Sequence, residues 1–236
     1  MNIKICAVIP VKNFAAAKRR LAPALHANER AIVARLMFED VLESLMQCRD
    51  AVAGTLVTTS DAEAAAIARS RGASVISDDG ASGINAAIDR ALRHVIGEDG
   101  AIVVPSDIPQ VSPSTIMTAA GAISTGRTLV IAAAAEDGGT NLLACRPAVA
   151  MPLCFGPQSF HRHRRAALQA GFAVQELASA DLALDIDRPQ DLPAFLKLNS
   201  KTRTHAFLAN LGISDRLQAS SFADDTLELA AAGDAS

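Results

Sequence analysis

A chain of 236 residues, 50% of them hydrophobic, is long enough for one large domain or two small ones with a sizeable core. Its formal net charge of −3 argues against general nucleic-acid binding, which usually needs a basic face. No apolar run reaches the roughly 18 residues of a membrane-spanning helix, and the cysteines form no CxxC pair. We therefore expect a cytoplasmic protein with reduced thiols that binds neither nucleic acid nor membranes.

Apolar runs of strand length alternate with helical patterns along most of the chain. The first run, over residues 3–10, is almost continuously apolar, which is typical of a strand buried on both faces. Further strands are predicted over residues 52–58, 73–77, 101–105 and 128–134, and helices over residues 28–48, 62–71, 83–96 and 112–123. This alternation predicts an α/β fold, a Rossmann-like domain whose mainly parallel mixed sheet is flanked by helices.

The remaining part of the chain is less regular. We expect strands over residues 141–145, 173–177 and 182–186, and helices over residues 159–170 and 189–198. The single domain is predicted to span residues 1–198. A C-terminal extension over residues 199–236 is predicted to be weakly helical near 204–211 and 226–232, with a disordered end. We interpret this extension as an appended surface helix, with a homodimer contact as the alternative.

A basic loop follows the first predicted strand. Lys12, Lys18, Arg19 and Arg20 stand there among small residues, at the strand end where ligands bind in open parallel sheets. A solvated loop is one interpretation. We favour a cradle for a triphosphate, with Lys12 as a point charge and Arg20 as a fork. The P-loop and GxGxxG fingerprints are both absent, so neither standard nucleotide-binding fold is expected.

Carboxylates follow two other predicted strands. Asp107 comes directly after the strand over residues 101–105, where it could also simply cap a turn. Asp185 and Asp187 lie in LALDIDRPQDL, and we expect them to point to opposite faces of a strand, so that only one shares a site with Asp107. Asp191 is assigned to the start of the following helix. Two carboxylates from separate strand ends, beside a basic loop, suit Mg²⁺ that bridges phosphate oxygens.

Two further stretches combine glycine with hydrogen-bonding side chains. In DGGTNLLAC, Thr140 and Asn141 follow a Gly-Gly turn. In FGPQSFHRHRR, Gly156 precedes a predicted helix that has Ser159 in its first turn, which makes a ready anion site. The two histidines of this helix, two residues apart, diverge and make a poor zinc pair. By themselves these residues predict a metal-dependent enzyme that acts on phosphorylated substrates.

Six sequence blocks, in order, cover roughly residues 5–197: PVK with AKRRLAP, GINAAI, PSDIP, DGGTNLL, FGPQSFHRH and DIDRPQDL. In these blocks the chain resembles the guanylyltransferases of deazaflavin coenzyme F-420 biosynthesis. The resemblance implies a single-domain nucleotidyltransferase fold of the GT-A-like kind. It also implies the transfer of GMP from GTP to the phosphate of a three-carbon acid, with release of diphosphate. The acid would be 2-phospho-L-lactate, phosphoenolpyruvate or 3-phospho-D-glycerate.

The resemblance also implies roles for the basic loop and the carboxylates. Lys12, Lys18 and Arg20 match the loop that holds the triphosphate, where they would act in catalysis. Asp107 and Asp185, the first aspartate of the DID pair, match the metal ligands, and two Mg²⁺ ions are expected.

The substrate contacts are assigned by the same resemblance. Gly83 and Asn85 match the block near the nucleotide, GTP. Thr140, Gly156 and Ser159 match the contacts to the phosphorylated acid.

Two other classes of protein compete with this interpretation. Molybdopterin guanylyltransferases and cytidylyltransferases share the fold, but they usually carry a glycine-rich LAGG-like loop where this chain has VKNFAAAKRRLAP. A non-catalytic nucleotide-binding sensor is the second rival. It would have no need of metal ligands, so the presence of Asp107 and Asp185 together with Lys12 and Arg20 argues against it.

Overall fold

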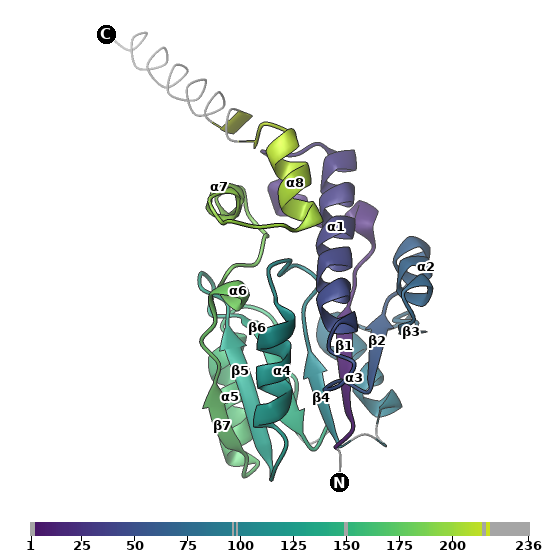
Figure 1. The fold of residues 1–236 in the computed structure, drawn as a ribbon, viewed down its shortest axis with the longest axis vertical. Helices are drawn as coiled ribbons and strands as arrows, with labels where there is room; N and C mark the ends of the chain where they lie inside the picture. Colours follow the sequence, from purple (N-terminus) through teal and green to yellow (C-terminus); the bar gives the residue numbers. More distant parts are fainter. Residues whose placement is uncertain (1–2, 96, 98, 149–150, 214–215, 218–236) are drawn as a thin grey trace, which may run out of the picture.

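A central strand, β1 (Ile5–Pro10), is buried along its whole length, as its continuous apolar sequence predicts. The computed structural model describes residues 3–95, 97, 99–148, 151–213 and 216–217. The other strands of this part are β2 (Gly54–Thr58), β3 (Ser74–Ile76), β4 (Gly100–Val103), β5 (Thr128–Ala133), β6 (Thr140–Arg146) and β7 (Ala173–Glu176). In these described residues they form a 7-stranded sheet with the order β3-β2-β1-β4-β6-β5-β7 (Figure 1).

Most neighbouring strands run parallel. β1 pairs in parallel with both β2 and β4, β2 with β3, and β5 with β7. β6 pairs antiparallel with β4 on one side and β5 on the other. The predicted mainly parallel mixed sheet is therefore confirmed, and β6 is the strand that runs against the others.

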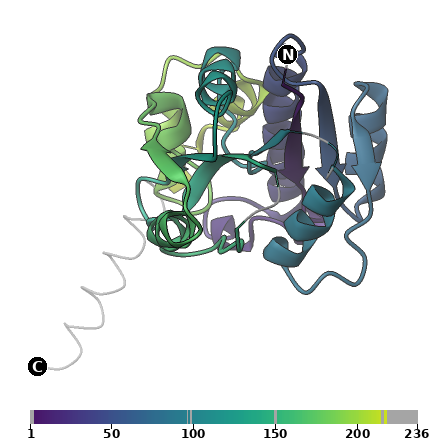
Figure 2. The same ribbon diagram turned by 90° about the horizontal axis from the view of Figure 1, so that it is seen from below.

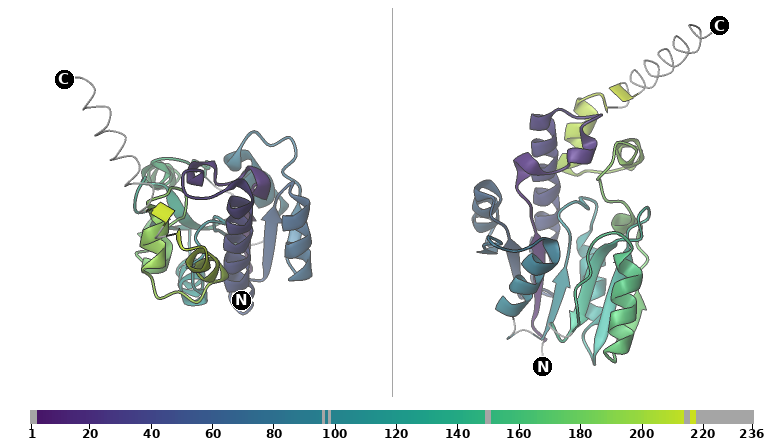
Figure 3. Two further views of the ribbon diagram at one scale, coloured as in Figure 1. Left: turned by 90° about the horizontal axis from the view of Figure 1, so that it is seen from above. Right: turned by 180° about the vertical axis from the view of Figure 1, so that it is seen from behind.

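Helices cover both faces of the sheet (Figure 2). α1 (Ala27–Met46), α2 (Ala62–Ser70) and α4 (Pro113–Ala122) pack on the face to which Ile5, Ala7 and Ile9 point. α3 (Ile84–His94) and α5 (Ser159–Gln169) pack on the face of Cys6 and Val8, as the view from behind shows (Figure 3). The period-2 alternation of β1 thus divides the core into two clusters.

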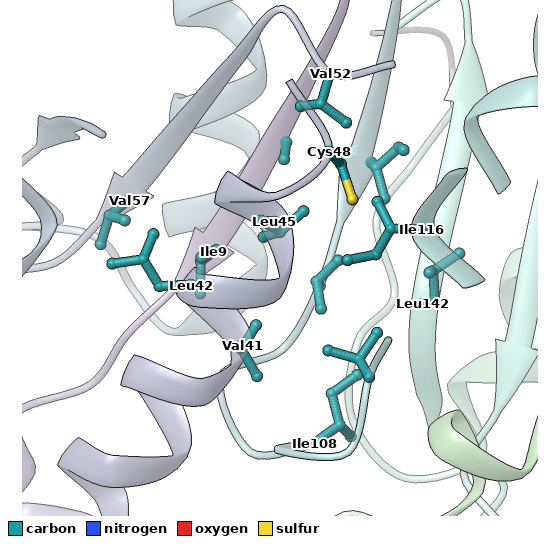
Figure 4. Close-up of a cluster of buried hydrophobic side chains, with 14 of the residues drawn as sticks. Ile9, Val41, Leu42, Leu45, Cys48, Val52, Val57, Ile108, Ile116 and Leu142 are labelled. Carbon is teal, nitrogen blue, oxygen red and sulfur yellow. The ribbon is translucent and has the colours of Figure 1, made fainter. Parts of the chain in front are cut away.

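α1 supplies much of the first cluster (Figure 4). Its Val41, Leu42 and Leu45 lie between β1 and the segment that carries Ile108 and Ile116. Leu42 and Leu45 are each 1% exposed, so each contributes about 1.5–3 kcal/mol of hydrophobic stabilisation. This packing fixes the C-terminal half of α1 against the sheet, and the N-terminal half projects beyond the strand ends (Figure 1).

A third cluster lies beyond the carboxyl ends of the strands. α8 (Arg203–Asn210) packs there on α1, and α7 (Asp191–Leu196) packs on α8 (Figure 1). Leu192, Phe195 and Leu208 are buried in this cluster. Asp40 of α1 also caps α8, because its carboxylate accepts the backbone N–H groups of Arg203 and Thr204, each at 3.0 Å. The division of the chain at residue 198 stays a prediction, although α8 adds buried side chains to this cluster.

The strand predicted over residues 182–186 is wrong. The structure has a short helix there, α6 (Ala180–Ala183), followed by extended chain outside the sheet. Leu182 is nonetheless buried in the first cluster. The apolar pattern therefore indicated a buried side chain but not a strand paired with the sheet. The helix predicted near residues 226–232 lies outside the described residues. Within the described part, no helix has both the length and the apolar character needed to cross a membrane.

Candidate active site

A cavity of about 240 Å³ opens at the carboxyl ends of β1 and β4. Its lining comes from the loop after β1, from α1, from the loop between β3 and α3, and from the segment after β4. Both apolar and charged side chains line it: Val11, Phe14, Ala34, Met37, Ile84 and Ala87 are apolar, and Lys12, Lys18, Asp78, Asp107 and Asp187 are charged. The cavity therefore lies at the edge of the sheet where ligands bind in open parallel sheets.

Lys18 lies among the carboxylates of the site. Its Nζ is 2.8 Å from Oδ2 of Asp107 and 3.6 Å from Oδ1 of Asp187, and its side chain is only 9% exposed. Burial lowers the pKa of the Lys18 ammonium, but the charges of Asp107, Asp187 and Asp185 and the hydrogen bond to Asp107 raise this pKa above its usual value. Lys18 is therefore a fixed positive charge in the cavity beyond the carboxyl end of β4.

Asp185 and Asp187 both lie at this site, so the expectation that they face opposite sides is wrong. The backbone N–H of Ile186 donates to the backbone oxygen of Asp107 at 3.1 Å, and the Ile186 side chain is fully buried in the third cluster. In extended chain, residues two apart share a side. With Ile186 turned into the core, its two neighbours both turn toward Lys18, whose pKa both of them raise.

The two aspartates have different surroundings. Burial and the neighbouring charge of Asp107 raise the pKa of Asp185 to about 6, against the opposing effects of Asn141 and Lys18. Asn141 donates to Oδ1 of Asp185 at a long 3.4 Å. Asp187 instead pairs with Arg20 at 2.7 Å. Asp191 accepts the backbone N–H groups of Asp187 and Arg188, so it shapes the turn that presents Asp187.

The carboxylates carry more negative charge than their partners offset. Three carboxylates, Asp107, Asp185 and Asp187, face the two cations Lys18 and Arg20. Burial and the charge of Asp107 together raise the pKa of Asp185. No group of three His, Cys, Asp or Glu side chains forms a metal cage among the described residues. Mg²⁺, however, is usually held by one or two carboxylates together with substrate phosphates. Asp107 and Asp185 fit that arrangement.

The basic loop enters the cavity in part. Lys12 is exposed and lines the cavity. Arg20 is 64% exposed and is held by Asp187, and Arg19 is exposed and does not line the cavity. Lys18 has a left-handed backbone, with φ 54°, just before the 3-10 turn η2 (Arg19–Leu21). The loop thus turns its buried lysine toward the carboxylates and leaves its arginines at the surface.

Gly83 and Asn85 stand at the start of α3 and are placed differently. Gly83 lines the cavity, and its φ of 93° favours glycine over any other residue. The Asn85 side chain does not line the cavity. Its amide accepts the N–H of Phe155 at 2.7 Å and donates to the Phe155 carbonyl at 3.1 Å. Asn85 therefore ties α3 to the segment that precedes Gly156.

Thr140 and Ser159 meet in a buried hydrogen-bonded chain. Their hydroxyl oxygens are 2.9 Å apart, and Thr140 Oγ1 is 3.0 Å from Nδ1 of His163. Nε2 of His163 accepts the backbone N–H of Cys154 at 2.7 Å. Nδ1 therefore carries the ring proton, and this N–H donates a hydrogen bond to Oγ1 of Thr140. Ser159 and His163 are both 0% exposed. The hydrogen-bonded group of Ser159, Thr140 and His163 is therefore enclosed in the protein and supports the start of α5 from behind.

The start of α5 is already partly satisfied. The N–H groups of Ser159 and Phe160 donate to the carbonyls of Gly156 and Gly138. The contacts predicted between the phosphorylated acid and Thr140, Gly156 and Ser159 stay predictions. The sequence indicated His163 only as a poor zinc ligand and did not indicate its place in this hydrogen-bonded group. Its i,i+4 spacing from Ser159 was the available signal.

His163 gives this region a pH dependence. Burial, and next the charge of Arg162, lower the pKa of His163 to about 4, below its usual 6.5. The unfolded chain therefore binds this proton more readily, and stability falls as the pH drops from about 6.5 toward 4. Between pH 7.5 and pH 5 the wild type should lose about 2 kcal/mol of its free energy of unfolding through His163. We expect the His163→Gln variant not to show this part of the loss. Urea unfolding of both proteins at the two pH values measures this difference, and parallel losses would contradict it.

Solved structures share this fold. A putative nucleotide-diphospho-sugar transferase from Desulfovibrio desulfuricans has a TM-score of 0.74 at 18% identity, covering 90% of this chain and 97% of that one. Glucosyl-3-phosphoglycerate synthase from Mycobacterium tuberculosis, solved with Mn²⁺, uridine diphosphate and phosphoglyceric acid, has a TM-score of 0.55 at 17% identity, covering 81% and 74%. A nucleotidyl transferase from Methanothermobacter thermautotrophicus also shares the fold, with a TM-score of 0.57 at 20% identity, covering 82% of this chain and 96% of that one.

The chain belongs to the guanylyl transferase CofC-like family, whose model matches residues 5–228. It is 34% identical to 2-phospho-L-lactate guanylyltransferase of Methanothermobacter thermautotrophicus over 226 residues, 92% of this chain and 99% of the relative. It is 37% identical to phosphoenolpyruvate guanylyltransferase of a Roseiflexus species, covering 80% and 83%. It is 33% identical to 3-phospho-D-glycerate guanylyltransferase of Phenylobacterium zucineum, covering 87% and 95%. The family expected from the sequence is confirmed, and the protein is a guanylyltransferase.

Proposed function

We propose that this protein transfers GMP from GTP to the phosphate of a three-carbon phospho-acid and releases diphosphate, as a step of coenzyme F-420 biosynthesis. The observation that carries the proposal is the cavity at the ends of β1 and β4, where the buried ammonium of Lys18 contacts Asp107 and Asp187. The charge of Asp185, which does not line the cavity, also acts on Lys18. In a chain of this family, that arrangement suits a triphosphate and a divalent cation. The acceptor would be 2-phospho-L-lactate, phosphoenolpyruvate or 3-phospho-D-glycerate, the acids named for the relatives.

Asp107 and Asp185 would hold Mg²⁺, most simply as two ions, at the boundary between nucleotide and acid. The carboxylate oxygens of the site and the Mn²⁺ in the glucosyl-3-phosphoglycerate synthase structure support a divalent cation. When bound, the ion offsets charge on the phosphate oxygens. Lys12 and Arg20 would hold the β- and γ-phosphates at the rim, and Lys18 would orient Asp107. A phosphate oxygen of the acid attacks the α-phosphorus, the bond to the bridging oxygen breaks, and diphosphate leaves.

The acid would lie near the start of α5 against the backbone of Gly156, and the enclosed hydroxyls of Thr140 and Ser159 would lie behind that contact. The φ of 125° at Gly156 leaves the backbone bare for a close approach. The chain from His163 through Thr140 to Ser159 fixes the hydroxyl geometry behind it.

Diphosphate release tests the proposal. GTP is supplied with each of the three acids in turn, with Mg²⁺ and then with excess chelator. We expect one acid to support turnover well above the other two, and the chelator to abolish it. Absence of diphosphate release with all three acids would reject the proposed reaction, and tight GTP binding in that case would support a nucleotide sensor.

Asp185 and Asp187 should differ in the size of their effects. We expect Asp185→Asn to lower turnover by about 10²-fold or more, because a metal ligand is lost. Asp187→Asn should lower it by about tenfold, because Lys18 keeps its shorter contact with Asp107. Diphosphate release at saturating Mg²⁺ measures both. A greater loss from Asp187→Asn would transfer the metal role to Asp187.

A further inference from the structure

One charged side chain of the cavity has no role in the chemistry above. Asp78 lies in the loop between β3 and α3 and lines the cavity together with Ala81, Gly83 and Ile84. Its Oδ1 atom is buried from solvent and accepts no hydrogen bond from the described part of the chain. An unsatisfied carboxylate oxygen is unfavourable in a folded protein, so its presence at a ligand cavity calls for a donor from the ligand.

The backbone around Asp78 is held in place. Nη1 of Arg90, on α3, donates to the carbonyl of Ser77 at 3.1 Å and to the carbonyl of Asp79 at 2.8 Å. The carbonyl of Asp78 itself accepts the N–H of Ala81 at 2.9 Å. Arg90 thus clasps the loop on both sides of Asp78. This loop can present a carboxylate in a fixed direction, which recognition of a rigid ligand needs.

The cavity walls near this loop suit a flat heterocycle. Ile84 and Ala87 of α3 and Val11 and Phe14 of the loop after β1 are apolar. The lysines that would bind phosphates, Lys12 and Lys18, line the same cavity. A nucleotide with its phosphates at the lysines would therefore place its base among apolar side chains, with Asp78 as an acceptor at its edge.

We propose that the Asp78 carboxylate selects guanine, by accepting the N1–H and 2-amino donors that stand side by side on one edge of that base. A carboxylate accepts such a donor pair in bidentate fashion. Adenine presents a lone pair at N1 and no 2-amino group, so it would leave the buried oxygen unsatisfied and repel it. Sites that lose a hydrogen-bonding partner in this way discriminate strongly. The inference deepens the proposed function and rests on GTP being the nucleotide.

The wild-type protein gives the first test, by equilibrium dialysis of nucleotides in the absence of any acid. We expect the dissociation constant of GTP to be lower by about tenfold or more than that of inosine triphosphate, which lacks only the 2-amino group. It should bind about 10²-fold or more tightly than ATP. Equal affinities for GTP and inosine triphosphate would overturn the proposal.

The variant Asp78→Asn gives the second test. An asparagine amide accepts from N1–H but donates where the carboxylate accepted, so it should fit xanthine, which has a carbonyl in place of the 2-amino group. We expect affinity for GTP to fall by about 10²-fold and affinity for xanthosine triphosphate to rise above that for GTP. An equal loss for all four nucleotides would show a structural or phosphate-binding role and would reject the inference.

Asp79→Asn is the matched control. Asp79 is the adjacent residue of the loop, is exposed, and accepts a hydrogen bond from Ser77 rather than lining the cavity. Its base preference should equal that of the wild type. Dialysis needs no acceptor acid, so the base preference can hold even if no acid supports turnover. In that event the proposed reaction fails and the role of Asp78 stands.

Discussion

Asp107→Asn is expected to reduce turnover by about 10³-fold while the fold stays intact. Asparagine keeps the shape and one acceptor oxygen but loses the charge that faces Lys18 at 2.8 Å and that would bind the metal ion. Loss of a metal ligand removes several kcal/mol of transition-state stabilisation. Diphosphate release at saturating Mg²⁺ measures the effect, and circular dichroism melting measures the fold.

Stability should move little in this variant, because the lost ion pair with Lys18 is opposed by a second effect. Asp107 is one of the causes that raise the pKa of Asp185, so removing its charge relieves a repulsion between carboxylates. Asp89→Asn is a suitable control, because Asp89 forms only a surface pair with Arg93 on α3 and such pairs contribute little. Turnover of Asp107→Asn within tenfold of the wild type would remove Asp107 from the metal site.

Lys18→Met should produce the second large loss, about 10²-fold in kcat/KM for GTP. The substitution keeps the length of the buried stem and removes the charge among three carboxylates. Lys18 is one of the groups that lower the pKa of Asp185. Without it that pKa rises further, so activity should decline at a higher pH than in the wild type as the medium is acidified.

The pH profile distinguishes this from a packing defect. Lost packing would lower the rate equally at all pH values, whereas lost charge moves the acidic limb. We also expect the variant to unfold more easily by about 1–3 kcal/mol, because half-buried carboxylates lose their partner. Lys197→Met, at an exposed position after α7, should change neither quantity. An unshifted acidic limb in Lys18→Met would contradict the proposed role.

Most strands and helices could be predicted from the sequence, because buried positions recur as apolar residues with the period of a strand or a helix. The alternation in β1 and the glycines at helix ends placed elements to within a few residues. LALDI was the exception. Leu182 and Ile186 are buried, but the side-chain amide of Asn141 donates a hydrogen bond to the Leu182 carbonyl, and α6 forms in place of a strand. Which backbone groups pair depends on a side chain 41 residues away, and the local pattern does not contain that information.

The site residues were harder to predict in a consistent way. Lys18, Asp107 and Asp185 could be named from their strand ends and from the family blocks, but the inward turn of Asp187 follows from the burial of Ile186, a tertiary contact. Asp78 stands at the end of β3, a position that could have marked it. It was overlooked because SDDG resembles an ordinary polar turn.

The capping of α8 by Asp40 has a consequence for the order in which the protein matures. Asp40 is synthesised early, yet the N–H groups that satisfy it come 163 and 164 residues later. The cluster that α8 completes also packs α7, whose Asp191 shapes the turn of Asp187. A ribosome-bound chain can therefore assemble the central sheet before its active site. The cluster that packs α7 is complete only after α8 has been synthesised.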